Sequence, residues 1–137
     1  MGASNVEINT FTILRNGIDS SLEIIRDDRT GFYNVTKTAK LIGELMIEQP
    51  GLYDSSIHKC NRARDWFKTD SATKLMVECA RITSLDNVRY DLNASTPKRF
   101  VGIYVHELLY NQFVTWLNPV YSMRVANLLR DYHKETI

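Results

Sequence analysis

The segment from residue 100 to residue 129, FVGIYVHELLYNQFVTWLNPVYSMRVANLL, constrains the fold more than any other part of the chain. Its first six residues alternate between two faces, which is typical of a β-strand. From His106 onward the apolar residues recur every three or four positions, which predicts a helix. Asn118 and Pro119 end that helix and begin another, because Asn caps free N–H groups and Pro suits the first helical position. We therefore expect a strand followed by two helices.

A small antiparallel meander is predicted before this segment. Residues 8–15 and 18–26 have strand character, and Asn16-Gly17 between them is the strongest short hairpin signal. A second turn at residues 27–31 leads into a short strand at 32–35. These three strands would pair in chain order.

Three helices are predicted between the meander and residue 83. The first begins near Thr36 as N-cap and carries Ala39, Ile42, Leu45 and Met46 on one face, before Pro50-Gly51 ends it. The second covers residues 56–68, SIHKCNRARDWFK. The third is capped by Asp70-Ser71 and turns these apolar residues inward: Ala72, Leu75, Met76, Cys79 and Ile82.

A second hairpin completes the expected architecture. Residues 88–92 alternate as a strand, and the loop at 93–99 joins them to the strand that begins at residue 100. The whole pattern predicts an α+β fold, with a small antiparallel sheet and hairpins packed against about five helices. It shows no repeat or linker, so we expect residues 1–137 to form a single domain.

Composition excludes several classes of protein. The 137 residues are 44% hydrophobic, which is enough for the core of one globular domain. No apolar run approaches the length of a membrane span, and no signal-peptide pattern opens the chain. Two cysteines are too few for a disulfide framework, and this suits a reducing compartment. We expect an intracellular domain with no membrane partner.

The net charge of +1 is unevenly distributed along the chain. Residues 1–30 hold three Lys/Arg against five Asp/Glu, whereas residues 31–104 hold eleven against eight. The modest positive excess therefore lies in the middle of the sequence.

Basic residues in this middle part are the candidates for nucleic-acid contact. Lysine and arginine displace counterions from phosphates, and Asn or Arg can pair with purine edges. The predicted helix at 56–68 supplies most of them, a helix start and the second hairpin supply the rest, and together they are Lys37, Lys40, Lys59, Asn61, Arg62, Arg64, Lys68, Lys98 and Arg99. The alternative is an ordinary solvent-facing helix surface, and the charge pattern alone leaves both interpretations open.

Other chemistry is poorly supported by the sequence. His58 and Cys60 lack the second paired motif that a tetrahedral zinc site needs. His106 is better explained as a helix-capping residue, and Cys60 and Cys79 as core residues. The aromatic residues Trp66, Trp116, Tyr104 and Tyr121 fit core positions rather than base stacking. No phosphate-binding loop, nucleophile motif or acid/base pair is present, so we expect no catalytic activity, metal or cofactor.

Three stretches resemble the KilA-N domain of bacteriophages and large eukaryotic DNA viruses. They are GFYNVTKTAKLIG, NRARDWFK and GIYVHELLYNQFVTWLNPVYSMRVANLL. The resemblance covers residues 31–129 and leaves 1–30 as an N-terminal hairpin extension. Phe32 and Val35 depart from the usual entry motif. The matching landmark positions are Gly31, Tyr33, Asn34, Thr36, Trp66, Gly102, Tyr104, Val105, His106, Leu109, Trp116 and Pro119.

The resemblance implies a winged-helix-like core related to the fungal APSES DNA-binding domain. It also implies a viral protein that works in the infected host cell, in either nucleus or cytoplasm. The expected partner is DNA, with duplex favoured over single strands or RNA, gripped mainly at its phosphates with low sequence specificity. Two alternatives stay open. One is a protein–protein adaptor that targets an effector, which the near-neutral charge favours, and the other is a homodimer.

Overall fold

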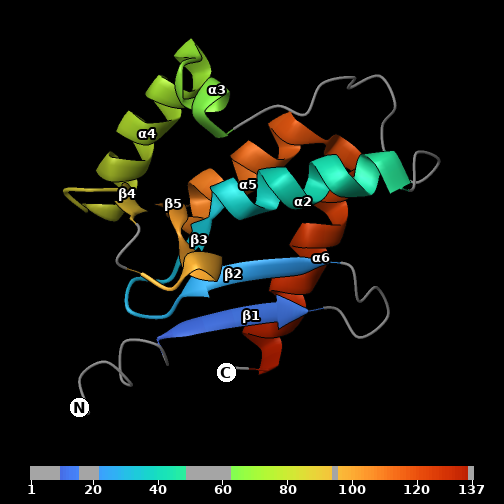
Figure 1. Cartoon of the computed structure of the whole chain (residues 1–137). Helices are drawn as coiled ribbons and strands as arrows, with labels where there is room; N and C mark the ends of the chain where they lie inside the picture. Colours follow the sequence, from blue (N-terminus) through green and yellow to red (C-terminus); the bar gives the residue numbers. More distant parts are fainter. Residues whose placement is uncertain (1–9, 16–21, 49–62, 94–95, 136–137) are drawn as a thin grey trace.

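A computed structural model describes residues 10–15, 22–48, 63–93 and 96–135. Five antiparallel strands form one sheet in the order β1-β2-β3-β5-β4 (Figure 1). The strands are β1 Phe11–Arg15, β2 Glu23–Asp27, β3 Phe32–Asn34, β4 Arg89–Leu92 and β5 Gly102–Val105. The helices are α2 Val35–Glu48, α3 Ala63–Phe67, α4 Asp70–Thr83, α5 Glu107–Leu117 and α6 Pro119–Glu135, with a 3-10 helix, η2, at Lys98–Phe100. The predicted α+β class is confirmed.

One face of the sheet forms the main core with α5 and α6. Leu14 of β1 lies opposite Ile24 of β2, and both are buried. On the same face Tyr33 stacks on Tyr110 of α5, with ring centroids 5.0 Å apart. Alternate residues of a strand share a face, so the sheet buries this set against the two C-terminal helices, and α6 runs behind β1 and β2 in Figure 1.

The opposite face is covered in part by η2, and one side of α2 borders it. The ring of Phe100 stacks on Phe11 of β1 at 4.2 Å between centroids. The hydroxyl of Tyr104 donates to the Phe100 carbonyl oxygen at 2.7 Å. These contacts hold η2 against the sheet. They thereby fix the positions of Lys98 and Arg99, the two residues of η2 that precede Phe100.

Asn34 joins the start of α2 to the chain beside η2. Its Oδ1 accepts from the backbone N–H of Lys37 at 2.9 Å, which makes Asn34 the N-cap of α2. Its Nδ2 donates to the carbonyl oxygens of Phe100 and Val101, at 3.5 and 3.3 Å. The predicted cap at Thr36 was wrong, because its hydroxyl accepts from the Ile103 N–H of β5 at 3.0 Å instead.

The first hairpin exists, but not with the predicted two-residue turn. β1 and β2 pair with Arg15 opposite Glu23, so residues 16–22 separate the paired ends. A two-residue turn at Asn16-Gly17 would place Arg15 opposite Ile18. The observed register therefore places the return strand five residues later in the chain than the two-residue turn would. Residues 16–21 themselves lie outside the described part.

The third helix also differs in detail from its prediction. Thr69, not Asp70, is the N-cap of α4, and its hydroxyl accepts from the Ala72 N–H at 3.1 Å. Ala72 and Cys79 are buried as expected, whereas Ile82 is 58% exposed. Leu75 and Met76 are partly buried against the core, and Ile82 lies in the last turn of α4, where its side chain is left outside.

The C-terminal segment follows its prediction closely. The Oδ1 of Asn118 caps α6 by accepting from the Tyr121 N–H at 3.1 Å. The Nδ1 of His106 accepts from the Leu108 N–H at 3.1 Å and caps α5, which confirms its structural role. Trp66, Tyr104 and Tyr121 are buried in the core, and Trp116 packs against it.

Candidate nucleic-acid interface

A cleft of about 240 Å³ lies between α2, β2 and η2. It brings together two of the predicted DNA-binding residues, Lys37 and Arg99, which are 62 positions apart in the sequence. Glu23, Ile25 and Leu41 complete its lining. No local sequence pattern predicts that these residues meet across three elements.

Local geometry explains why each side chain reaches the cleft. Glu23 and Ile25 alternate along β2 with the buried Ile24, so they project from the face that η2 crosses. Lys37 and Leu41 are four residues apart on α2 and therefore share one side of that helix. Arg99 is held at the rim because its neighbour Phe100 is stacked into the sheet.

Two predicted cations, Lys37 and Arg99, line this cleft, and two more lie on the same elements, α2 and η2. We call these four residues the basic rim: Lys37, Lys40, Lys98 and Arg99. Lys40 follows Lys37 by one helical turn and is exposed, and Lys98 and Arg99 are exposed on η2. The single acid in the cleft, Glu23, accepts from Arg15 Nε at 2.8 Å, so its charge is partly compensated. The rim can hold polyanions but is not purely cationic.

The predicted basic helix is described only at its end. Arg64 and Lys68 are exposed on and just after α3, but they do not line the cleft. Trp66 between them is buried, with its ring 5.5 Å from that of Phe113. The other predicted residues of this segment, His58, Lys59, Cys60, Asn61 and Arg62, lie outside the described residues, as do Pro50 and Gly51.

α3 and α4 form a helix–turn–helix that leads into the β4–β5 hairpin. Only Lys68 and Thr69 separate the two helices, and α4 is much the longer of them. The exposed side of α4 carries Lys74 and Arg81, neither of which the sequence analysis selected. Arg81 forms an ion pair with Glu78 one turn earlier, so this surface is close to neutral.

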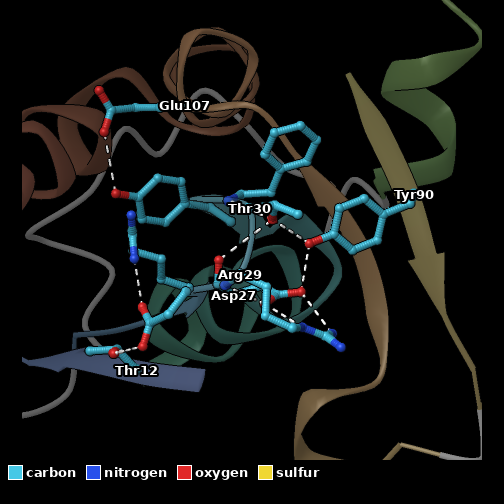
Figure 2. A network of polar contacts seen from close by, with 10 residues as sticks. Thr12, Asp27, Arg29, Thr30, Tyr90 and Glu107 are labelled. Carbon is cyan, nitrogen blue, oxygen red and sulfur yellow. Dashed lines mark hydrogen bonds and ion pairs between the residues drawn. The ribbon is translucent and has the colours of Figure 1, made fainter. Parts of the chain in front are cut away.

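A buried carboxylate ties the β2–β3 turn to β4 (Figure 2). Asp27 is 0% exposed and accepts from the Tyr90 hydroxyl at 2.6 Å and from the Arg29 guanidinium at 3.1 and 3.0 Å. Thr30 shares a further hydrogen bond with Tyr90. Burial alone would raise the pKa of Asp27, but the hydrogen bonds from Arg29 and Tyr90 outweigh it and hold that pKa below its usual range.

A second set of polar contacts joins the sheet to the C-terminal helices. The Tyr33 hydroxyl donates to Glu107 Oε1 at 3.2 Å, and the same oxygen lies 2.6 Å from His133 Nε2. Figure 2 shows Glu107 above the Asp27 network, on α5. Burial and the Glu107 carboxylate raise the pKa of Tyr33. These groups fix β3 between α5 and α6 and do not open into the cleft.

Sequence reasoning missed the acidic and apolar lining of the cleft. Glu23, Ile25 and Leu41 have no local motif, and only the β1–β2 register and the close approach of α2 bring them together.

In the described residues no three of the His, Cys, Asp and Glu side chains cluster so as to hold a metal ion. No helix in the described ranges is long and apolar enough to cross a membrane.

Comparison with known proteins adds the family. The KilA-N domain model matches residues 17–135 of this chain. A KilA-N domain-containing protein of Acanthamoeba polyphaga mimivirus is 21% identical over 112 residues, which are 81% of this chain and 41% of that protein. An uncharacterized fowlpox virus protein is 26% identical over 102 residues, covering 68% of each chain. The chain thus spans less than half of the mimivirus protein, and no solved structure matches it significantly.

Proposed function

This chain belongs to the KilA-N domain family, and from that membership we propose that it binds nucleic acid, with double-stranded DNA as the preferred form. The observation that carries the proposal is the meeting of Lys37 and Arg99 at one cleft, with Lys40 and Lys98 beside them. Viral relatives in mimivirus and fowlpox virus support an origin in a DNA virus, and so a role in an infected cell.

Phosphate contact is the mode that these side chains suit best. Each Lys or Arg that neutralises a phosphate releases condensed counterions, and this term does not depend on base sequence. The basic rim offers four such groups on two rigid elements, α2 and η2. We therefore propose backbone binding with low sequence specificity.

The cations around α3 provide a second proposed contact. Arg64 and Lys68 are exposed there. The preceding residues Lys59, Asn61 and Arg62, which lie outside the described part, stay predictions. A duplex that touched both regions would be gripped at two separated phosphate tracks. Arg64 and Lys68 belong to the first helix and the turn of this helix–turn–helix, and α4 separates them from the β4–β5 hairpin along the chain (Figure 1).

Fluorescence anisotropy with a short blunt-ended duplex tests the basic rim. We expect Lys37→Ala with Arg99→Ala to weaken binding at least roughly tenfold at low salt and to reduce the slope of log K against log salt by about 1.8. The matched control is Arg130→Ala with Lys134→Ala, which removes the same charge from exposed positions on α6. Equal affinities for the wild type and the rim variant would contradict the assignment.

A different function is favoured by one observation, the exposed apolar side chains of α4. Val77 is 68% exposed and Ile82 is 58% exposed. Apolar side chains at such positions fit a protein contact, either an adaptor surface or a homodimer interface. Sedimentation at increasing concentration tests the dimer. Self-association that Val77→Ser with Ile82→Ser abolishes would support it, and a monomer at all concentrations would exclude it.

A further inference from the structure

We propose that the cleft between α2, β2 and η2 seats one unpaired nucleotide of a DNA strand, an inference that rests on the proposed DNA binding. The basic rim alone explains phosphate contact with an intact duplex. The cleft contains more than cations, and its other three residues fit a base rather than a phosphate.

The apolar part of the cleft suits the face of a base. Ile25 projects from β2 and Leu41 from α2, and both side chains are half-buried. A stacked duplex does not offer a base face to the protein, whereas an unpaired or extruded base does. Two branched aliphatic side chains can therefore cover a base only when it has left the stack.

The charges of the cleft suit the two ends of a nucleotide. Lys37 and Arg99 would take the phosphate, and Glu23 would oppose it. A carboxylate at this position is unfavourable for a phosphate seat but accepts well from the amino group of a base, as acidic side chains do from cytosine N4. An ionised carboxylate has about four acceptor sites, so the bond from Arg15 to Glu23 Oε2 leaves acceptor capacity.

The volume sets the size of the ligand. At about 240 Å³ the cleft is smaller than the roughly 300 Å³ at which drug-sized pockets begin. A cleft of this size can take one base, with the sugar and phosphate at its open side, and not a paired segment. An end with an overhang, or a frayed pair, would supply such a unit.

Two duplexes of equal paired length test the seat, one blunt and one with a short single-stranded overhang. Anisotropy at fixed salt should show the overhang duplex bound roughly fivefold more tightly, the gain of about one additional good contact. Leu41→Ala removes half of the apolar cover and should bring this affinity ratio close to one. Leu108→Ala, the same substitution at an exposed position on α5, is the matched control and should keep the ratio.

Glu23→Gln is an independent test, because it changes the charge in the cleft and leaves the apolar lining unchanged. Removing the negative charge should raise affinity for the blunt duplex, because phosphate repulsion falls, and lower the overhang ratio, because the acceptor is weaker. If the cleft bound only a phosphate, Glu23→Gln would instead raise the affinities for both duplexes together and leave their ratio unchanged. That result would overturn the proposal. Equal binding of blunt and overhang duplexes by the wild type would also overturn it while DNA binding stands. No binding to either would overturn the proposed function itself.

Discussion

At the junction of β3, α2 and β5, the Asn34 side chain leaves no room for a side chain at Gly102. Gly102 has a φ of +149°, and a Cβ added there would lie 2.7 Å from Asn34 Oδ1 and 3.0 Å from Thr36 Cβ. All three residues are landmarks of the family resemblance. In this chain their role is to join backbone segments, which explains why sequence similarity alone does not locate a binding surface.

Substituting Gly102 should therefore be far more damaging than substituting Gly31. Gly102→Ala meets buried, hydrogen-bonded atoms and a strained φ, so we expect a loss of at least about 2–3 kcal/mol in unfolding free energy. Gly31→Ala meets only the flexible end of Arg26 at 3.1 Å, and a loss of about 1 kcal/mol is expected for its φ of +79°. Urea denaturation of the two variants compares them directly, and equal losses would contradict the close approach.

Asp27 makes the stability of the fold depend on pH. Its pKa is lower in the folded chain than in the unfolded chain, so its stabilising effect is complete above the unfolded value of about 3.9. The effect is lost as the pH falls through the lower, folded value. We expect the unfolding free energy to drop in acid below about pH 4.

Asp27→Asn should cost about 2–3 kcal/mol at neutral pH. Both carboxylate oxygens accept hydrogen bonds, Oδ1 from Arg29 and Oδ2 from Arg29 and Tyr90, whereas an amide keeps one acceptor oxygen and turns an NH2 group toward these donors. The difference from wild type should shrink toward pH 3, because the carboxyl group takes up a proton in the unfolded chain there and the advantage of the folded carboxylate falls. Asp91→Asn is the control, since Asp91 is exposed and its pair with Arg89 spans 3.6 Å. A difference that stayed constant with pH would rule out the ionised carboxylate as its cause. Chemical denaturation at pH 7 and pH 3 provides both measurements.

Elements were predictable from sequence where the signal is local. The boundary between α5 and α6 follows from Asn118-Pro119, whose capping chemistry needs no distant partner. The register of β1 against β2 was not predictable from Asn16-Gly17. It depends on burying Leu14, Leu22 and Ile24 together against the C-terminal helices, and that is a property of the packed core.

Helix starts show the same division between local and distant effects. Thr69, Asp70 and Ser71 are all suitable caps by residue type, and only the turn after α3 selects Thr69. We expect Thr69→Ala to lower the unfolding free energy by about 1 kcal/mol, and Asp70→Ala to change it by less than half of that. Thermal unfolding of both variants measures the two losses. A larger loss for Asp70→Ala than for Thr69→Ala would instead support Asp70 as the N-cap.

The candidate site was half predictable for a similar reason. Basic residues can be selected by type, so Lys37, Lys40, Lys98 and Arg99 were found in advance. Their grouping was not, because it requires η2 to be fixed by the stacking of Phe100 on Phe11. The cleft-lining residues Glu23, Ile25 and Leu41 carry no signal of their own.

For the molecule as a whole, the small net charge limits long-range attraction to DNA. Binding should then depend on the few cations in contact. We expect the slope of log K against log salt to lie between about −3.6, for the four cations of the basic rim, and about −7.2, for all eight predicted cations. Anisotropy across a salt series measures it, and a shallower slope would contradict engagement of the full rim.

The double attachment of Asn34 has a consequence for how the chain is completed during synthesis. Its amide stays buried, yet both carbonyls that accept from it belong to residues 100 and 101. Until residues 100 and 101 have been synthesised, β3 and α2 therefore lack the acceptors that hold their junction. We expect the segment around Asn34 to reach its final form only after η2 and β5 are present, so that segments far apart in the sequence fold together.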